Sequence, residues 1–275
     1  MPAERIGESL AYINWTVLTA LSVGSFGAVA LGRLRTEATR GYLAFTGFAA
    51  AALGALAYLS DTSLPAAGAV ISDPAWDPIR RIVLLAFVIL AVAYAVAIVR
   101  GRRAPALATA GLVAGGAVLV LAGLSWGGGT VGIVSLVVQL GALTAALGGV
   151  WASMILGHWY LVTPKLGERP LVLFARALAV VVAVQLGLFV VWLAIGAGPS
   201  GQPGFAALVG SSALFVWLRL IVGLAFPLVI SWAAIQTART RSMESATGLL
   251  YIDVAAIAAS TIVAAGLYFG AGLLV

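Results

Sequence analysis

One histidine, two aromatic residues and a lysine lie close together near position 160, where they could act on a redox ligand. The segment reads Gly157-His158-Trp159-Tyr160, and Lys165 follows shortly after it. An imidazole that titrates near neutral pH, a phenol and an ammonium could hydrogen-bond and protonate the head group of a quinone at a membrane surface. The same residues are also typical of an aromatic belt, in which Trp and Tyr lie at the level of the lipid head groups beside a cationic residue.

Two charged residues, Asp253 and Arg176, interrupt long apolar stretches of the chain. A lone carboxylate inside a membrane is unfavourable by about 3 kcal/mol, so Asp253 needs a partner or a water-filled cavity. Arg176 lies a similar distance into its own apolar stretch, and the two are predicted to form a half-buried charge pair. Such a pair fits a proton-accepting or ligand-binding site. It equally fits an ion pair that locks two helices together, or an arginine that extends to lipid phosphate.

Two glutamines and two arginines complete the set of candidate polar groups. Gln139 and Gln185 fall inside apolar segments, where a glutamine most often hydrogen-bonds a neighbouring helix. Each is also a candidate to hold a quinone carbonyl or a polar substrate. Arg80 and Arg219 are expected to anchor at the outer interface or to pair with one of three nearby acids, namely Asp61, Asp73 or Asp77.

The residue inventory excludes several kinds of site. The chain has no cysteine and a single histidine, so it cannot by itself hold an iron–sulfur cluster, or a haem between two histidines. No phosphate-binding loop, serine-hydrolase elbow, zinc motif or dinucleotide fingerprint is present, and no metal site is expected. The sequence therefore predicts no autonomous catalytic motif and no covalently bound cofactor, and it leaves open whether the chain is part of an enzyme.

Composition places these residues in a membrane. Of the 275 residues, 63% are hydrophobic and only 9% are charged, whereas soluble proteins contain about 25% charged residues. Because a helix needs about 20 apolar residues to cross a bilayer, eight spans can be marked. They lie near residues 10–32, 41–60, 82–99, 106–126, 131–157, 171–196, 214–238 and 247–274. The predicted fold is an all-α integral membrane protein.

The basic residues of the loops predict an orientation. Ten of them follow the first, third, fifth and seventh spans: Arg33, Arg35, Arg40, Arg100, Arg102, Arg103, Lys165, Arg169, Arg239 and Arg241. By the positive-inside rule these loops lie in the cytoplasm, with both termini on the other side of a bacterial inner membrane. The net charge of +6 therefore reflects the topology, and no nucleic-acid partner is expected.

The two halves of the chain resemble each other. Residues 80–102 and 219–241 are identical at nine of 23 ungapped positions, including the paired arginines Arg80 and Arg219. This match predicts a first four-helix repeat at 1–128 and a second at 129–275. Because each repeat has an even number of spans, the two bundles are expected to share one orientation. Convergent membrane composition is the alternative explanation.

These observations lead to one functional hypothesis and two alternatives. Eight spans in two bundles resemble, in architecture alone, the haem-free quinone-binding anchor subunits of the NrfD-like family. The residues near His158, the predicted pair of Asp253 and Arg176, and the lack of redox ligands in the chain predict a membrane subunit of an electron-transfer complex that binds quinone or supplies a proton route, with other membrane or peripheral subunits as partners. The resemblance in architecture agrees with this hypothesis. A small-solute or ion transporter, and a structural or assembly subunit without its own ligand, are the alternatives.

Overall fold

The protein is built from long helices, as the composition predicts. The computed structural model describes residues 9–65, 72–163, 165–199 and 204–275, and no strand occurs in these ranges. Within them, eight helical segments are long and apolar enough to cross a membrane. They are α2 (Leu10–Arg35), α3 (Arg40–Thr62), α4 (Asp77–Val99) with the preceding 3₁₀ turn η1 (Pro74–Trp76), α5 (Pro105–Trp126), α6 (Thr130–Val162), α7 (Arg169–Ile195), the segment α8–η3–α9 (Ala213–Leu220, Ile221–Ala225, Phe226–Arg239) and α10 (Met243–Ala271).

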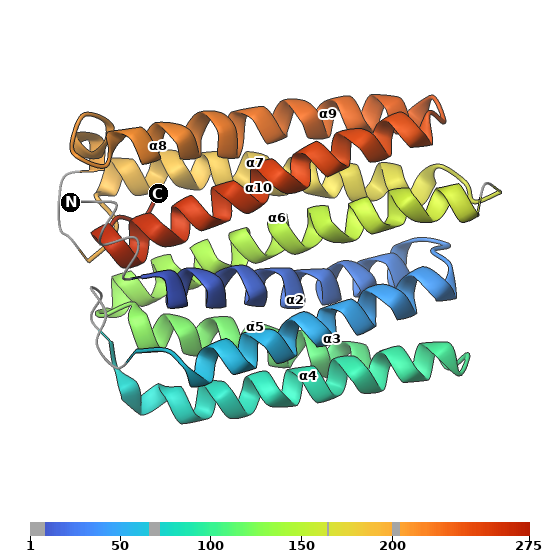
Figure 1. The fold of residues 1–275 in the computed structure, drawn as a ribbon, viewed down its shortest axis with the longest axis horizontal. Coiled ribbons are helices and arrows are strands. Elements are labelled where there is room, and N and C mark those ends of the chain that lie inside the picture. The colour runs from blue at the N-terminus through green and yellow to red at the C-terminus, as the bar shows by residue number, and fades with distance from the viewer. Residues whose placement is uncertain (1–8, 66–71, 164, 200–203) are drawn as a thin grey trace.

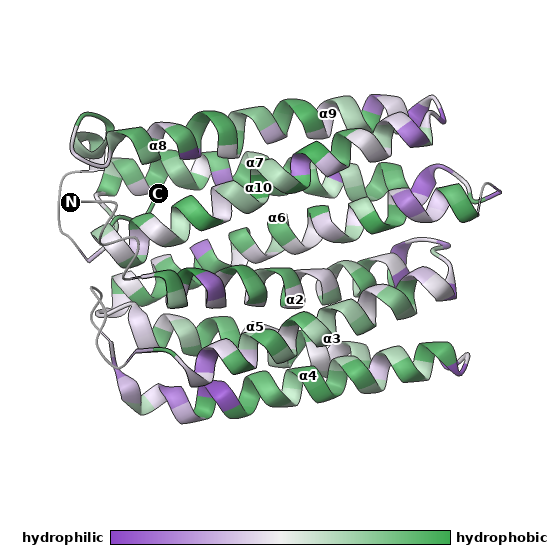
Figure 2. Ribbon diagram, viewed as in Figure 1, coloured by the Kyte–Doolittle hydropathy of each residue, from purple (hydrophilic) through white to green (hydrophobic). Residues whose placement is uncertain are grey.

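The helices run roughly antiparallel, and their loops gather at two ends of the molecule (Figure 1). The nine arginines and one lysine named above lie at the end formed by residues 36–39, 100–104, 165–168 and 240–242, which we call the basic end. Figure 2 shows hydrophobic residues along most of each helix and hydrophilic ones at these turns, with a further hydrophilic group at the opposite end, where α3 ends and α4 begins. The helices therefore present an apolar belt with a strongly basic rim, as a multi-pass membrane protein requires.

Helices α2 and α6 form the centre of the structure and pack against each other (Figure 1). On one side, α2 packs on α3, α3 on α4, and α4 on α5. On the other side, α6 packs on α7 and α10, while α9 lies between α7 and α10. The only short helix beyond the spans in the described ranges is η2 (Gly204–Leu208), which precedes α8. Functional side chains are therefore held by two groups of helices joined along α2 and α6.

Glycines permit the closest helix contacts of this centre. A Cβ atom added at Gly148 of α6 would overlap the backbone of Gly24 and Ser25 in α2. A Cβ atom at Gly157 would in turn overlap the side chain of Thr247 in α10. Small residues let helix backbones approach closely in membranes, where dispersion rather than the hydrophobic effect drives helix association. These two glycines thus set how α6 packs on its neighbours.

The seventh span contains a π-helical turn, η3, for an identifiable reason. Pro227 has no N–H to donate to the carbonyl of Gly223, four residues earlier, and its ring would clash with that carbonyl. The extra residue of the π turn relieves this clash. The carbonyl oxygen of Gly223 accepts a hydrogen bond from the hydroxyl of Ser260 in α10, at 2.9 Å. The proline therefore creates a cross-link between the seventh and eighth spans.

Two predicted boundaries differ from the observed ones by five residues, more than the others do. The fifth span was expected to end at Gly157, but α6 continues to Val162, because nothing before the Thr163-Pro164 step interrupts the helix. The third span was expected from Ile82, but α4 begins at Asp77, with proline near its first turn and the Asp73 side chain capping the turn before it. Both extra stretches of helix contain polar residues at the end of an apolar span, and hydropathy alone assigns such residues to a loop.

Candidate functional site

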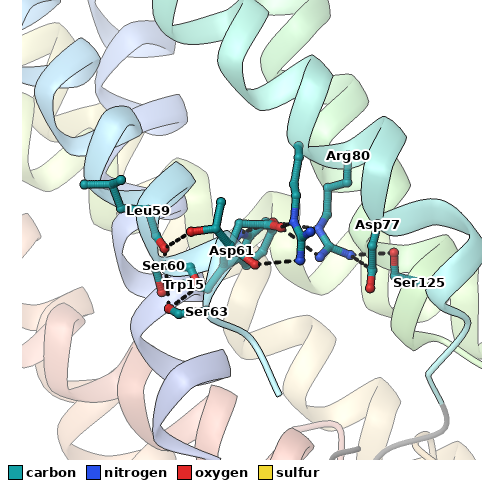
Figure 3. A network of polar contacts seen from close by, with 10 residues as sticks. Trp15, Leu59, Ser60, Asp61, Ser63, Asp77, Arg80 and Ser125 are labelled. Atoms are coloured by element: carbon teal, nitrogen blue, oxygen red, sulfur yellow. Dashed lines mark hydrogen bonds and ion pairs between the residues drawn. The ribbon is translucent and has the colours of Figure 1, made fainter. Parts of the chain in front are cut away.

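The largest buried polar cluster surrounds Asp61, at the end of the molecule opposite the basic end (Figure 3). Asp61 is completely buried, and Arg80 forms a bidentate ion pair with it, Nε to Oδ2 at 2.8 Å and Nη2 to Oδ1 at 3.2 Å. Arg81 donates to Asp61 Oδ1 at 2.9 Å, and the indole of Trp15 donates to Oδ2 at 2.8 Å. One carboxylate thereby connects α2, α3 and α4.

Arg80 is also held by groups outside this carboxylate. Its Nη1 donates to Asp77 at 2.7 Å and to the hydroxyl of Ser125 at 2.6 Å. Its guanidinium lies 4.5 Å from the centroid of the Trp126 ring, a cation–π distance. We call the six polar residues Trp15, Asp61, Asp77, Arg80, Arg81 and Ser125 the Asp61 network. It contains two carboxylates and two guanidiniums, so its charges balance.

The Asp61 network confirms one of the expected roles of Arg80, pairing with Asp61 and Asp77. The third candidate acid, Asp73, instead accepts from the backbone N–H of Ala75 and caps η1. Burial of Arg80 to 1% side-chain exposure excludes the alternative of an anchor at the lipid interface. Because both carboxylate oxygens of Asp61 are engaged, the network fits a structural clamp of four helices rather than a ligand site.

Arg219, the sequence counterpart of Arg80, lies in a different environment. It is also buried, but it donates to the side-chain oxygen of Gln185 at 2.9 Å and to the hydroxyl of Ser260. Its Nε has no hydrogen-bond partner, and no ion pair involves it within the described part of the chain. The second half therefore uses neutral partners where the first half uses carboxylates.

Both candidate glutamines hydrogen-bond neighbouring helices. Gln185 of α7 donates to the carbonyl of Ala142 in α6 at 2.7 Å, in addition to accepting from Arg219. Gln139 of α6 donates to the main-chain oxygen of Val275 at 3.0 Å and accepts from the indole of Trp192 at 3.1 Å. All these groups are satisfied within the protein, so neither glutamine presents a free amide to a ligand.

The predicted charge pair between Asp253 and Arg176 is not among the ion pairs of the described residues. Asp253 is completely buried, and its Oδ2 accepts from the hydroxyl of Ser231 in α9 at 2.7 Å. Its Oδ1 has no partner. Arg176 lies on the exposed face of α7. Depth in the membrane can be estimated from sequence, but helix rotation cannot, and rotation turns Asp253 toward α9 and Arg176 away from the core.

The residues around His158 do not form one cluster. His158 and Lys165 are exposed, and Trp159 packs on the rings of Tyr42 and Phe45. Tyr160 is buried and donates to the carbonyl of Gly167 at 2.6 Å. Because α6 continues through this segment, successive side chains are rotated by about 100° around its axis. This arrangement is that of residues at the end of a membrane helix, not of a shared binding site.

A groove between the two groups of helices is the site that sequence inspection missed. It has a volume of about 340 Å³. Small and apolar side chains form most of its lining: Val23, Gly24, Gly27, Ala28 and Leu31 of α2, Leu112 and Gly116 of α5, Gly141, Thr144, Ala145, Gly149 and Ser153 of α6, and Phe174, Ala177, Leu178 and Val181 of α7. We call it the Thr144 groove.

Two features suggest that the Thr144 groove holds a ligand. A Cβ atom at Gly116, Gly141 or Gly149 would meet no atom within 4 Å, so protein packing does not require glycine at these positions. Thr144 is 6% exposed, and its hydroxyl makes no hydrogen bond within the described residues. The hydroxyl is not among the fully buried unpaired atoms of the described residues, so it is accessible from the groove. The groove thus offers an apolar channel with one free hydrogen-bond donor.

The sequence contains a signal for this groove. Gly141, Ala145 and Gly149 recur every four residues on one face of α6, and Thr144 lies on the same side. Such a stripe usually indicates helix packing, and Gly148, the neighbour of Gly149, does serve that purpose. Only the structure separates the glycines that contact another helix from those that line open space.

Comparisons with known proteins identify no relative. No family model, no curated protein and no solved structure matches the chain.

Proposed function

We propose that the protein is an integral membrane subunit of an electron-transfer complex and holds an isoprenoid quinone in the Thr144 groove. The observation that carries this proposal is the unpaired Thr144 hydroxyl, which lines an otherwise apolar groove between two groups of helices. Ligand sites are typically apolar concavities with few, well-placed polar groups, and they form preferentially between helices. A quinone combines carbonyl acceptors with a long apolar tail, which is the complement of this lining.

Individual residues have distinct roles in the proposed site. Thr144 would donate a hydrogen bond to a quinone carbonyl, and Phe174 and Leu178 would contact the ring or the tail. The open glycines Gly116 and Gly141 leave room for the isoprenoid chain. A bound quinone supplies two-electron redox chemistry coupled to protons. Because the chain has no cysteine and one exposed histidine, the electrons must come from a cofactor of a partner subunit.

The proposal includes a tandem repeat of residues 1–128 and 129–275 in one orientation. Two corresponding arginines support it. Arg80 bonds Asp61 in the second span and Ser125 in the fourth, whereas Arg219 bonds Gln185 in the sixth and Ser260 in the eighth. In each half, the arginine of the third span therefore bonds a residue of the second span and a residue of the fourth. The Thr144 groove lies between these halves, lined by α2 and α5 of one and α6 and α7 of the other.

The proposed location is a bacterial inner membrane, with the basic end in the cytoplasm. The excess of loop arginines at one end supports this orientation. A periplasm-active phosphatase fused after Val275 is expected to be active, and the same fusion after Arg103 inactive. The reverse pattern would contradict the orientation. A pair of cytoplasm-active reporter fusions at the same positions is the control for expression.

Filling the groove is expected to abolish quinone binding. Gly141→Leu places four carbon atoms in the open space and should lower the affinity for a photoreactive azidoquinone with a decyl tail by more than tenfold. Thr144→Val removes one neutral hydrogen bond, and about 1 kcal/mol corresponds to roughly fivefold weaker binding. The measurement is concentration-dependent photolabelling of purified protein in mild detergent, with the labelled segment identified by mass spectrometry and with competition by unlabelled quinone.

Matched variants separate binding from folding. Gly187→Leu introduces the same side chain on the exposed face of α7, where a Cβ atom also meets no neighbour, and should leave labelling unchanged. Thr19→Val removes an unpaired hydroxyl that is fully buried and does not line the groove, and it should leave labelling unchanged. Labelling that is unaffected by Gly141→Leu, or that maps outside α2, α5, α6 and α7, would contradict the proposal.

A further inference from the structure

We infer that a second cavity, between α2 and α5 at the basic end, binds the phosphate group of an anionic phospholipid. The cavity has a volume of about 500 Å³. It is lined by Ala30, Arg33, Leu34, Arg103, Pro105, Ala108, Thr109 and Leu112, and we call it the Arg33 cavity. It does not depend on the quinone proposal, although Leu112 also lines the Thr144 groove.

The charge of the Arg33 cavity is unbalanced. Arg33 lies in the last turn of α2 and Arg103 just before α5, so two arginines from separate parts of the chain line one cavity. Neither forms an ion pair or a hydrogen bond within the described residues, whereas Arg80 and Arg241 both have carboxylate partners. No acidic residue lines the cavity. Two guanidiniums at one cavity without a carboxylate are suited to bind a phosphate through charge-assisted hydrogen bonds.

The start of α5 adds a second source of positive potential. Ala104 precedes the helix in a left-handed conformation with φ of 44°, and no side chain caps the first turn. Pro105 occupies the first helical position, so the next N–H groups, of Ala106 and Leu107, lack intrahelical acceptors. The N-terminus of a helix favours anions. The N-terminus of α5 therefore adds to the attraction that the two arginines exert on an anion, and it would not define a site without them.

The apolar part of the lining selects a lipid over a soluble phosphate. Leu34 is 75% exposed, and Ala30, Ala108 and Leu112 continue the cavity along α2 and α5 toward the membrane interior. A soluble phosphate would leave these groups in contact with water. A phospholipid would place its phosphate on Arg33 and Arg103 and its acyl chain on the apolar residues, as basic pockets between membrane helices do.

Lipid retention by the purified protein tests this inference. The wild type, purified in mild detergent and given phosphatidylglycerol, is expected to retain the lipid in native mass spectra. Arg33→Ala with Arg103→Ala should reduce the retained fraction at least tenfold. The control is Arg100→Ala with Arg102→Ala, which removes the same charge from the same end of the protein but not from the cavity. It should retain the lipid as the wild type does.

Three results would overturn the inference. The first is equal retention of phosphatidylglycerol by the two double variants. The second is equal retention of phosphatidylglycerol and phosphatidylcholine by the wild type. The third is displacement of the lipid by millimolar inorganic phosphate, which would indicate a soluble-anion site. Azidoquinone labelling of α6 is measured on the same samples. Loss of lipid with normal labelling, or the reverse, distinguishes failure of this inference from failure of the quinone proposal.

Discussion

Replacement of Asp61 by alanine is expected to destabilise the protein by about 3 to 5 kcal/mol, the usual range for removing one partner of a buried ion pair. The physical reason is that Asp61 receives hydrogen bonds from Arg80, Arg81 and the indole of Trp15. Without it, Arg80 stays buried with only Asp77 as a counter-charge, and the indole loses its acceptor. The measurement is the midpoint of unfolding of the detergent-solubilised protein, followed by helical circular dichroism in increasing denaturing detergent.

Two variants serve as controls for this effect. Asp73→Ala removes an exposed carboxylate that only caps η1, and it should cost no more than about 1 kcal/mol. Arg219→Met removes a buried guanidinium but leaves no carboxylate unpaired, so it should change the stability much less than Arg80→Met does. Equal losses for Arg80→Met and Arg219→Met would show that charge balance does not explain the Asp61 network.

The second large effect is expected at the crossing of α2 and α6. Gly148→Ala adds a methyl group where the backbone of Gly24 already lies, so the two central helices must separate. Overpacking of a core typically costs about 1 to 3 kcal/mol, and more when the obstacle is backbone, because backbone cannot adopt another rotamer. The unfolding midpoint should fall accordingly, and the yield of folded protein from membranes should fall with it.

The adjacent residue provides the matched control. Gly149→Ala adds the same methyl group to the same helix, but its Cβ atom meets no neighbour within 4 Å. Alanine is also the better helix former by about 1 kcal/mol, so this variant should be as stable as the wild type or more stable. If Gly148→Ala and Gly149→Ala have the same midpoint of unfolding, close packing of α2 on α6 does not hold the two groups of helices together.

Local patterns predicted several features correctly because those features depend on composition along the chain. Eight long apolar helices were expected and are present in the described residues. Arg80 was expected to pair with a nearby acid, and Asp61 lies only 19 positions away, at the other end of one loop. The glutamines were most simply expected to bond neighbouring helices, and both do. The partner of Arg80 is close in sequence, and the glutamines bond groups of the helices that lie next to them.

Other predictions required knowledge of helix rotation and were not met. Asp253 and Arg176 were matched by depth, but one faces Ser231 and the other is exposed. His158 and Tyr160 are two positions apart, so they were grouped, yet one is exposed and the other buried. In a chain that is apolar on all sides, polarity does not mark which face of a helix is inward, so the sequence contains little information on rotation.

The sequence by itself determines the medium, the spans and the distribution of charge between the two ends, because these follow from how many apolar residues occur in a row and where arginines interrupt them. Only the tertiary structure decides which glycines touch another helix and which line open space, and therefore that Thr144 lies with a free hydroxyl in a groove. The physical reason is that a glycine has no side chain to indicate its surroundings. Contact with a neighbouring helix is a property of the packed pair and is absent from either helix alone.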